Sequence, residues 1–182
     1  WPIYSILHLI KMRILKLLNV IIGIDPDVDK SGFAQLNRKT MDIAYDTLTF
    51  PELIKALRKA KDQATADRIT LRVVVEASWL ISHNWHIGNG QVRGAGAIAK
   101  TGYNVGRNHQ VGLMIVQYCK ALGIDVTEQR PLKKCWKGPD GKITHAELAY
   151  FVPGLPTRTN SEERDALLLM WNEANLPMKI KI

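Results

Sequence analysis

The fold is decided by one stretch of the sequence, Val20-Ile21-Ile22-Gly23-Ile24-Asp25-Pro26-Asp27. This short, β-branched apolar run ends abruptly in carboxylates at a turn signal, which is typical of a buried strand. In α/β folds, ligands and metals bind at the sheet edge where such strands end. Asp25 is therefore the first candidate site residue. Two later segments are expected to meet it, Val73-Val74-Val75-Glu76 and Glu162-Glu163-Arg164-Asp165-Ala166-Leu167.

The size and composition of the chain narrow the class of protein. Its 182 residues amount to about one domain, and a hydrophobic content of 46% indicates a globular fold. A formal charge of +8 and a pI near 9.6 favour a polyanionic partner, first of all nucleic acid; a merely basic soluble protein is the alternative. Cys119 and Cys135 are too few for a Cys-rich zinc site and suit a reducing, cytoplasmic compartment. His83 and His86 alone are weak evidence for a metal site.

An apolar segment at 1–10, followed by basic residues, precedes the core strand. It is shorter than the ~20 apolar residues that a transmembrane helix needs, and a signal peptide would carry its positive charges before the apolar part. We therefore expect no membrane partner, and we expect Met12 to be the natural start, with 1–11 as an upstream extension. The predicted parts of the chain are an N-terminal extension at 1–17, a core domain at 18–176 and a C-terminal tail at 177–182.

The pattern of the core predicts an α/β domain. Residues 18–49 alternate roughly with period two and predict three antiparallel strands. Helical spacing over 51–66 and a second apolar strand at 69–75 complete a strand–helix–strand unit, whose right-handed crossover makes the two strands parallel. If these strands are neighbours, Asp25 and Glu76 project from the same edge of the sheet.

The second half of the chain alternates glycine-rich and periodic segments. Residues 77–105 hold many glycines and predict a long connection, of a kind that is usually functional or mobile. A helix is expected over 104–122, a short strand at 124–127, a helix around 144–150 and a last helix over about 160–174. Together with the first half, this predicts a mixed five-stranded sheet flanked by helices.

The most basic part of the sequence is a segment at 129–145. Basic residues with an interleaved aromatic suit an element that contacts phosphates and stacks on a base, although a solvated loop would have the same composition. The candidate DNA contacts in this segment are Arg130, Lys133, Lys134, Trp136, Lys137 and Lys142.

Four carboxylates are candidates for a metal site. Glu162 and Asp165 are three residues apart on a predicted helix, so they share a face, and they could join Asp25 and Glu76 if that helix packs near the strand ends. Converging carboxylates repel one another unless divalent cations lie between them. Mg²⁺ prefers oxygen ligands, and two such ions about 4 Å apart can activate a water and stabilise the leaving oxygen of a phosphodiester.

Three of these carboxylates also have a structural interpretation. Asp25 before Pro26 is a common way to begin a turn. Glu162 could complete a capping box with Thr159, and Glu76 could be an ordinary charge at a strand end. Only their joint position at the ends of apolar elements favours a site.

A calcium loop is a rival interpretation of the opening stretch, because Asp25-x-Asp27-x-Asp29 matches its first three ligands. The match fails after that point. Lys30 stands where the loop needs glycine, Leu36 where it needs glutamate, and a strand rather than a helix precedes it.

The order of these motifs resembles the RuvC family of Holliday-junction resolvases within the RNase H-like superfamily. The likeness covers about 18–172 and rests on Ile22-Gly23-Ile24-Asp25-Pro26 with Ser31-Gly32, on Val74-Val75-Glu76, and on Asp165-Ala166-Leu167. It implies an RNase H-like fold and a Mg²⁺- or Mn²⁺-dependent endonuclease with two ions, prokaryotic or phage-encoded. Such an enzyme cleaves branched DNA in recombination and repair as a homodimer.

The resemblance also implies roles for single residues. The family's catalytic and metal-binding carboxylates fall on Asp25, Glu76 and Asp165, and its fourth acidic or histidine position falls on Glu162. Asp25 would bridge both metals, Glu76 and Asp165 would each hold one, and Glu162 would assist. Trp79 holds the place of an aromatic residue that helps to open the junction centre, or else it is a core or lid tryptophan.

Two further segments resemble family features. Arg130-Pro131-Leu132-Lys133-Lys134 is similar to the start of a Lys-rich segment that contacts the DNA backbone. The helix over 104–122, with Gly106 and Gly112, resembles the helix through which resolvases dimerise.

The sequence departs from the family pattern in three places. Asp27 stands where the family has glycine, the 77–105 connection is longer, and Trp136–Lys142 replaces a glycine-rich element. A divergent phage or mobile-element member would fit. Two other functions stay open: a nuclease of the same superfamily that acts on structured RNA or other DNA structures, and an inactive nuclease fold that only binds nucleic acid.

Overall fold

The computed structural model describes residues 19–81 and 94–178. The predicted extension at 1–17 with its start at Met12, the histidines His83 and His86, and the last four residues lie outside this part. Within the described residues, no helix is both long enough and apolar enough to cross a membrane.

The first three strands form the predicted antiparallel meander. β1 (Val20–Asp25) pairs with β2 (Ser31–Asn37), which pairs with β3 (Ile43–Leu48). β1 is apolar without alternation because both of its faces are covered: Ile21 packs in one hydrophobic cluster, while Ile22 packs in the other.

A helical crossover then returns the chain to the same sheet. α2 (Phe50–Ala66) begins with a capping box between Thr49 and Glu52, and it leads to β4 (Leu71–Glu76), which runs parallel to β1. β5 (Asp125–Gln129) lies parallel to β4 at the far edge. The strand order is β3-β2-β1-β4-β5, with three antiparallel and then two parallel strands. This is the predicted mixed sheet, and its topology is that of an RNase H-like fold.

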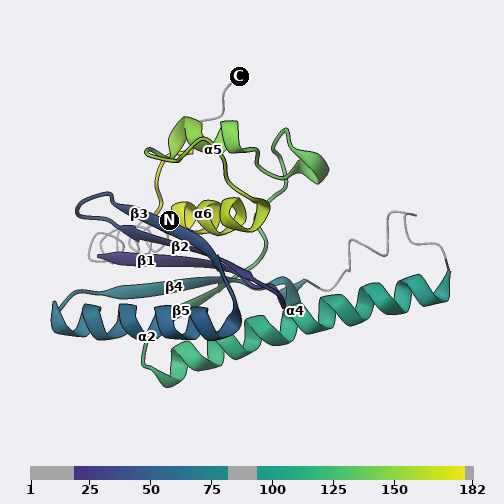
Figure 1. Cartoon of the computed structure of the whole chain (residues 1–182), viewed down its shortest axis with the longest axis horizontal. Helices are drawn as coiled ribbons and strands as arrows, with labels where there is room; N and C mark the ends of the chain where they lie inside the picture. The colour runs from purple at the N-terminus through teal and green to yellow at the C-terminus, as the bar shows by residue number, and fades with distance from the viewer. Residues whose placement is uncertain (1–18, 82–93, 179–182) are drawn as a thin grey trace, which may run out of the picture.

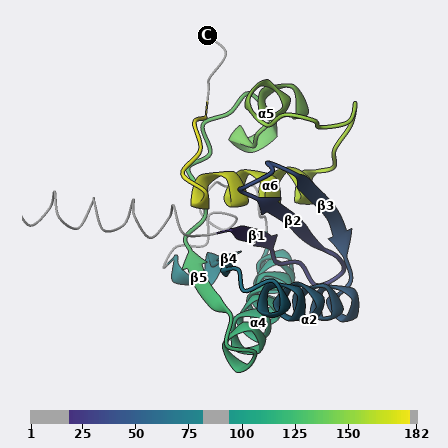
Figure 2. The ribbon, with the colours of Figure 1, turned by 90° about the vertical axis from the view of Figure 1, so that its left-hand side faces the viewer.

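Helices cover both faces of the sheet (Figures 1 and 2). α6 (Ser161–Glu173) lies against one face, with α5 (His145–Phe151) beyond it, while α2 and α4 (Ala95–Ala121) cover the other. The core is therefore two separate hydrophobic clusters divided by the sheet. Two short 3₁₀ turns, η1 (Ser78–Leu80) and η2 (Pro139–Gly141), follow β4 and precede α5.

The helix α4 corrects one prediction. It begins at Ala95, so the last third of the expected 77–105 connection is helical rather than loop. Gly96 and Gly102 contributed to the predicted loop, but both lie in this helix, and nothing lies within 4 Å of the place where a Cβ would be at either of them. The first half of α4 extends past the end of the sheet (Figure 1), so it carries no apolar stripe that could have predicted it.

Candidate active site

Strand register brings the first two carboxylates together. Ile24 is paired with Val75 across the parallel β1–β4 ladder, so the next residues, Asp25 and Glu76, are neighbours at the carboxyl ends of these strands. Side chains alternate between the faces of a strand, and Ile21 of β1 lies in the cluster beneath α6. Asp25, four residues on, faces the same helix.

Two glycines let α6 approach this part of the sheet. A Cβ on Gly23 would lie 2.5 Å from the backbone oxygen of Ala166, and a Cβ on Gly32 would overlap the backbone oxygen of Glu162. Gly32 is the antiparallel partner of Asp25. The glycine seam therefore fixes the first turns of α6, which carry Glu162 and Asp165, next to the tip of β1.

The N-terminus of α6 is capped in a way that leaves Glu162 available. Asn160 is the N-cap, and it forms a reciprocal capping box with Glu163. The capping box between Thr159 and Glu162, considered from the sequence, is therefore wrong. Thr159 is buried and hydrogen-bonded to His145 instead. Glu162 accepts a hydrogen bond from the neighbouring Ser161 hydroxyl, 2.8 Å away, and lines the same hollow as the other three carboxylates.

The electrostatics of the hollow are those of crowded anions. Burial, followed by the charges of Glu76 and Asp165, holds the pKa of Asp25 well above its ordinary value. Burial and the charge of Asp165 likewise raise the pKa of Glu76. All four side chains keep some contact with solvent. A site of this kind favours any cation that can enter it.

One cation is already there. The ammonium group of Lys142 lies 2.6 Å from Oδ2 of Asp165 and forms an ion pair with it. Burial alone would lower the pKa of Lys142, but the hydrogen bond to Asp165 and the charges of Asp165, Asp25 and Glu162 raise it. In the described part of the chain, no three His, Cys, Asp or Glu side chains are arranged to hold a metal ion as they stand. The carboxylates share Lys142 instead.

The hollow has a volume of about 310 Å³ and combines acidic and basic walls. Of the seven predicted DNA contacts, four line it together with the carboxylates, whereas Trp79, Arg130 and Lys137 do not. The four are Lys133, Lys134, Trp136 and Lys142.

Both candidate tryptophans are engaged with other side chains. Trp136 stacks on Phe151 with ring centroids 6.0 Å apart, and it packs against the α6 cluster. Trp79 donates a hydrogen bond from Nε1 to Glu128, 3.2 Å away, and its ring lies where a Cβ on Gly112 would be. Their contact with DNA stays a prediction.

The sequence did not predict one pair of hydrogen bonds at the rim of the hollow. Asp27, which departs from the family pattern, accepts a hydrogen bond from Nδ2 of Asn108, 3.0 Å away on α4, while Oδ1 of Asn108 accepts one from the backbone of Val28. This reciprocal pair ties the β1–β2 turn to α4. No local pattern signals a contact between residues so far apart in the sequence.

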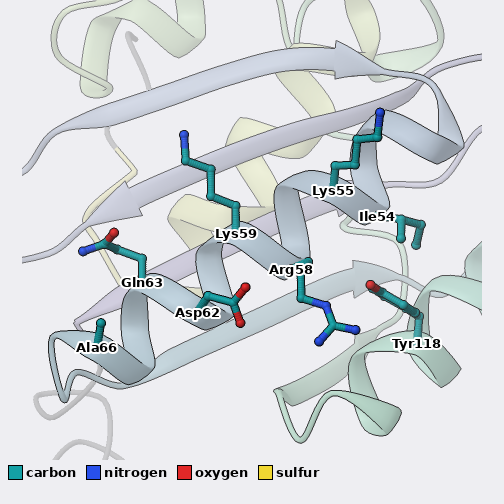
Figure 3. A pocket seen from close by; sticks show the side chains of 8 residues that line it. All are labelled: Ile54, Lys55, Arg58, Lys59, Asp62, Gln63, Ala66 and Tyr118. Carbon is teal, nitrogen blue, oxygen red and sulfur yellow. The ribbon is translucent and has the colours of Figure 1, made fainter.

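A larger hollow of about 590 Å³ lies between α2 and α4 (Figure 3). Arg58 of α2 and Tyr118 of α4 lie on its two sides, and Asp62 is the one acidic residue among those that line it. It contains none of the four carboxylates. The larger hollow therefore lacks the reactive groups. We place the candidate active site in the smaller hollow because the four carboxylates converge there.

Comparison with known proteins gives a limited result. No protein-family model matches the sequence, and no curated protein matches it. Among solved structures, the chain is similar to T. thermophilus RuvC in complex with a Holliday junction substrate. That alignment covers 83% of this chain and 89% of the other, with 13% sequence identity and a TM-score of 0.44. Any function must therefore follow from the side chains of this chain.

Proposed function

We propose that this protein is a metal-dependent, structure-specific endonuclease that cleaves phosphodiester bonds in branched DNA, like a Holliday-junction resolvase. One observation carries the proposal: Asp25, Glu76, Glu162 and Asp165 come from three separate elements and line one hollow at the carboxyl edge of the sheet. Half-buried carboxylates that repel one another destabilise a fold, so a functional reason for their convergence is favoured over a structural one.

The donor set fits Mg²⁺ or Mn²⁺. All four groups are carboxylates, which hard divalent cations prefer, and one of them, Asp165, already pairs with the Lys142 ammonium group. Asp25, Glu76 and Asp165 would hold two ions, with Glu162 assisting. When bound, such ions supply an activated water and stabilise the leaving oxygen of a phosphodiester. The chain itself fixes its acids through the β1–β4 register and the glycine seam.

The charge around the hollow supports a nucleic-acid substrate. Lys133 and Lys134 line the same hollow as the acids, and the whole chain carries a formal charge of +8. Basic side chains at the rim would bind the phosphates on either side of the scissile bond, while the acids would accept only a phosphate that is accompanied by metal ions.

We also propose that the enzyme is a homodimer that uses the outer half of α4. This half extends past the sheet, and Tyr103 on it is 66% exposed. A Cβ added at Gly102 or Gly106 would have nothing within 4 Å, so a second helix could approach closely there. A dimer would present two hollows to the two strands of a branched substrate that must be cut.

The test is a cleavage assay on a four-way junction, a flap and a structured RNA, each with and without Mg²⁺. We expect Mg²⁺-dependent cleavage of the junction by the wild-type protein and none by Asp25→Asn, which should bind the junction at least as tightly because it loses a negative charge. Preferred cleavage of RNA or the flap would change the substrate. Salt-dependent binding without any cleavage would favour the inactive nucleic-acid-binding protein.

A further inference from the structure

The ion pair between Lys142 and Asp165 differs from an ordinary surface pair in its surroundings. Besides Asp165, the charges of Asp25 and Glu162 act on Lys142, and Lys142 in turn lowers the pKa of Glu76, which burial and Asp165 raise. One ammonium group therefore interacts with all four carboxylates of the hollow.

The backbone of Lys142 is held firmly. Its N–H donates to the carbonyl of Pro139 and its carbonyl accepts from the N–H of Gly138, each at 3.0 Å. The next residue, Ile143, is buried, and its carbonyl accepts a hydrogen bond of 2.9 Å from Nε of Arg164. Because Arg164 precedes Asp165 on α6, the loop that carries the lysine is fastened to the helix that carries its acidic partner.

The side chain of Lys142 is held much less firmly than its backbone. It is 42% exposed, whereas the side chain of Asp165 is 20% exposed. The ammonium group donates to Asp165, and the lysine is the more exposed side chain of the pair. It can therefore leave the carboxylates by side-chain rotation, without movement of the loop.

Resting on the proposed function, we infer that Lys142 is the built-in counter-cation of the metal-free site, and that the entering divalent ion displaces it from Asp165. The lysine would act as a positioning residue: it keeps the four acids together before metal arrives. It would also explain why the acids are not arranged as metal ligands while the ammonium group is among them.

After displacement, the side chain of Lys142 would lie near other basic side chains. Lys133 and Lys134 line the same hollow, so an ammonium group that leaves Asp165 would join these basic side chains around a phosphate of the bound DNA. Lys142 could then contact phosphate, as its place in the basic segment predicts. The same side chain would serve as counter-ion before metal binding and as substrate contact after it.

The first test measures the affinity for Mn²⁺ alone, by titration without DNA. We expect Lys142→Met to bind Mn²⁺ about tenfold more tightly than the wild-type protein, because a competing unit charge has been removed. Lys142→Arg keeps the charge and should bind Mn²⁺ as the wild type does. Lys55→Met removes the same charge on α2, outside the hollow, and is the matched control.

This readout separates displacement from a merely structural role. If Lys142 only supported the fold of the site, its removal would leave Mn²⁺ affinity unchanged or weaken it. Either result, with a folded Lys142→Met protein, would overturn the inference.

A second test uses the wild-type protein and so does not depend on the folding of a variant. Acylation of lysines is mapped by mass spectrometry with and without Mg²⁺. Displacement predicts that labelling of Lys142 rises at least about threefold on Mg²⁺ addition, as its ion pair with Asp165 opens, while Lys55 is unchanged. Unchanged labelling at a Mg²⁺ concentration that supports cleavage would contradict displacement.

The two hypotheses fail in different ways. If the wild-type protein cleaves DNA with Mg²⁺ but neither readout responds, only the role of Lys142 is wrong. If Mn²⁺ binds and displaces Lys142 but no nucleic acid is cleaved, the counter-cation holds and the endonuclease does not. If Mn²⁺ fails to bind both the wild type and Lys142→Met, both are wrong.

Discussion

The helices α6 and α4 lie on opposite faces of one sheet and are built for different tasks. In α6, every residue from Ala166 to Trp171 is buried, and the helix backbone comes close to Gly23 and Gly32. In α4, burial is confined to the second half, which contains Gly112, Ile115, Val116 and Cys119. The first half extends beyond the sheet.

Under the proposed function, this difference separates the positioning of the acids by α6 from the presentation of a dimer surface by α4. A helix that must bring carboxylates to a strand end is fixed along its length, with no room for even one extra methyl group. A helix that presents a surface to a partner needs an anchor at one end only. In α4 the anchor includes Trp79 against Gly112 and the Asn108–Asp27 pair.

The largest expected effect comes from closing the glycine seam. Gly23→Ala would put a Cβ 2.5 Å from the Ala166 carbonyl and 2.8 Å from Cβ of Met170, so α6 must move away from β1. We expect a loss of about 3 kcal/mol or more in the free energy of unfolding, measured in urea, together with loss of cleavage. Gly102→Ala is the control. Equal stability of the two variants would contradict the claim that Gly23 lets α6 pack closely against β1.

Substitution of glycine by alanine should destabilise the protein in the anchor of α4 but not in its outer half. Gly112→Ala would push into the ring of Trp79 and should cost about 2 kcal/mol of stability. Gly106→Ala meets nothing within 4 Å, so it should stabilise the monomer by about 0.5–1 kcal/mol through helix propensity while weakening the proposed dimer. Thermal unfolding and analytical ultracentrifugation measure the two effects, and a destabilised Gly106→Ala monomer would show that the outer half is packed.

Crowding of the carboxylates predicts a pH-dependent stability. Because the folded-state pKa of Asp25 is raised, its contribution to stability is present below its ordinary pKa and is lost as the pH rises through the raised value. In metal-free protein, Asp25→Asn should therefore be more stable than wild type by about 1 kcal/mol near pH 7, and the difference should vanish below about pH 4. Urea titrations at several pH values measure this difference in stability. A difference that does not depend on pH would refute the claim that burial and the neighbouring carboxylates raise the pKa of Asp25.

The smallest effect concerns the two thiols. Burial raises the pKa of Cys119, on the inner half of α4, to about 12, whereas Cys135 is exposed beside the hollow. At about pH 8 a thiol reagent should modify one cysteine per folded chain, since the thiolate is the reactive form. Peptide mapping should find the label on Cys135, and rapid labelling of Cys119 would show that the inner half opens.

Much of the fold could be predicted because burial leaves a pattern in the sequence. The apolar run of β1 reflects two covered faces, whereas the alternation of β3 and the helical spacing of α2 each reflect one. The crossover rule then placed Asp25 beside Glu76. The outer half of α4 escaped prediction for the opposite reason: without a covered face it has no apolar stripe, and its glycines imitate a loop.

The acids of the site could be predicted from the sequence, but their counter-ion, Lys142, could not. Asp25, Glu76 and Asp165 follow or precede apolar runs, so the sequence indicates where they end up. Lys142 lies in a loop, and its contact with Asp165 depends on how Gly138–Lys142 folds back on itself. The role of Glu162 likewise depended on which residue caps α6, and the capping pattern fits both Thr159 and Asn160.

Anomalous X-ray diffraction from crystals soaked in Mn²⁺ tests most directly whether the four acids form a metal centre. We predict manganese peaks at the carboxylates of Asp25, Glu76 and Asp165, with the Lys142 side chain turned away from Asp165. Crystals with no manganese at Asp25, in which Lys142 still pairs with Asp165 at saturating Mn²⁺, would contradict the account.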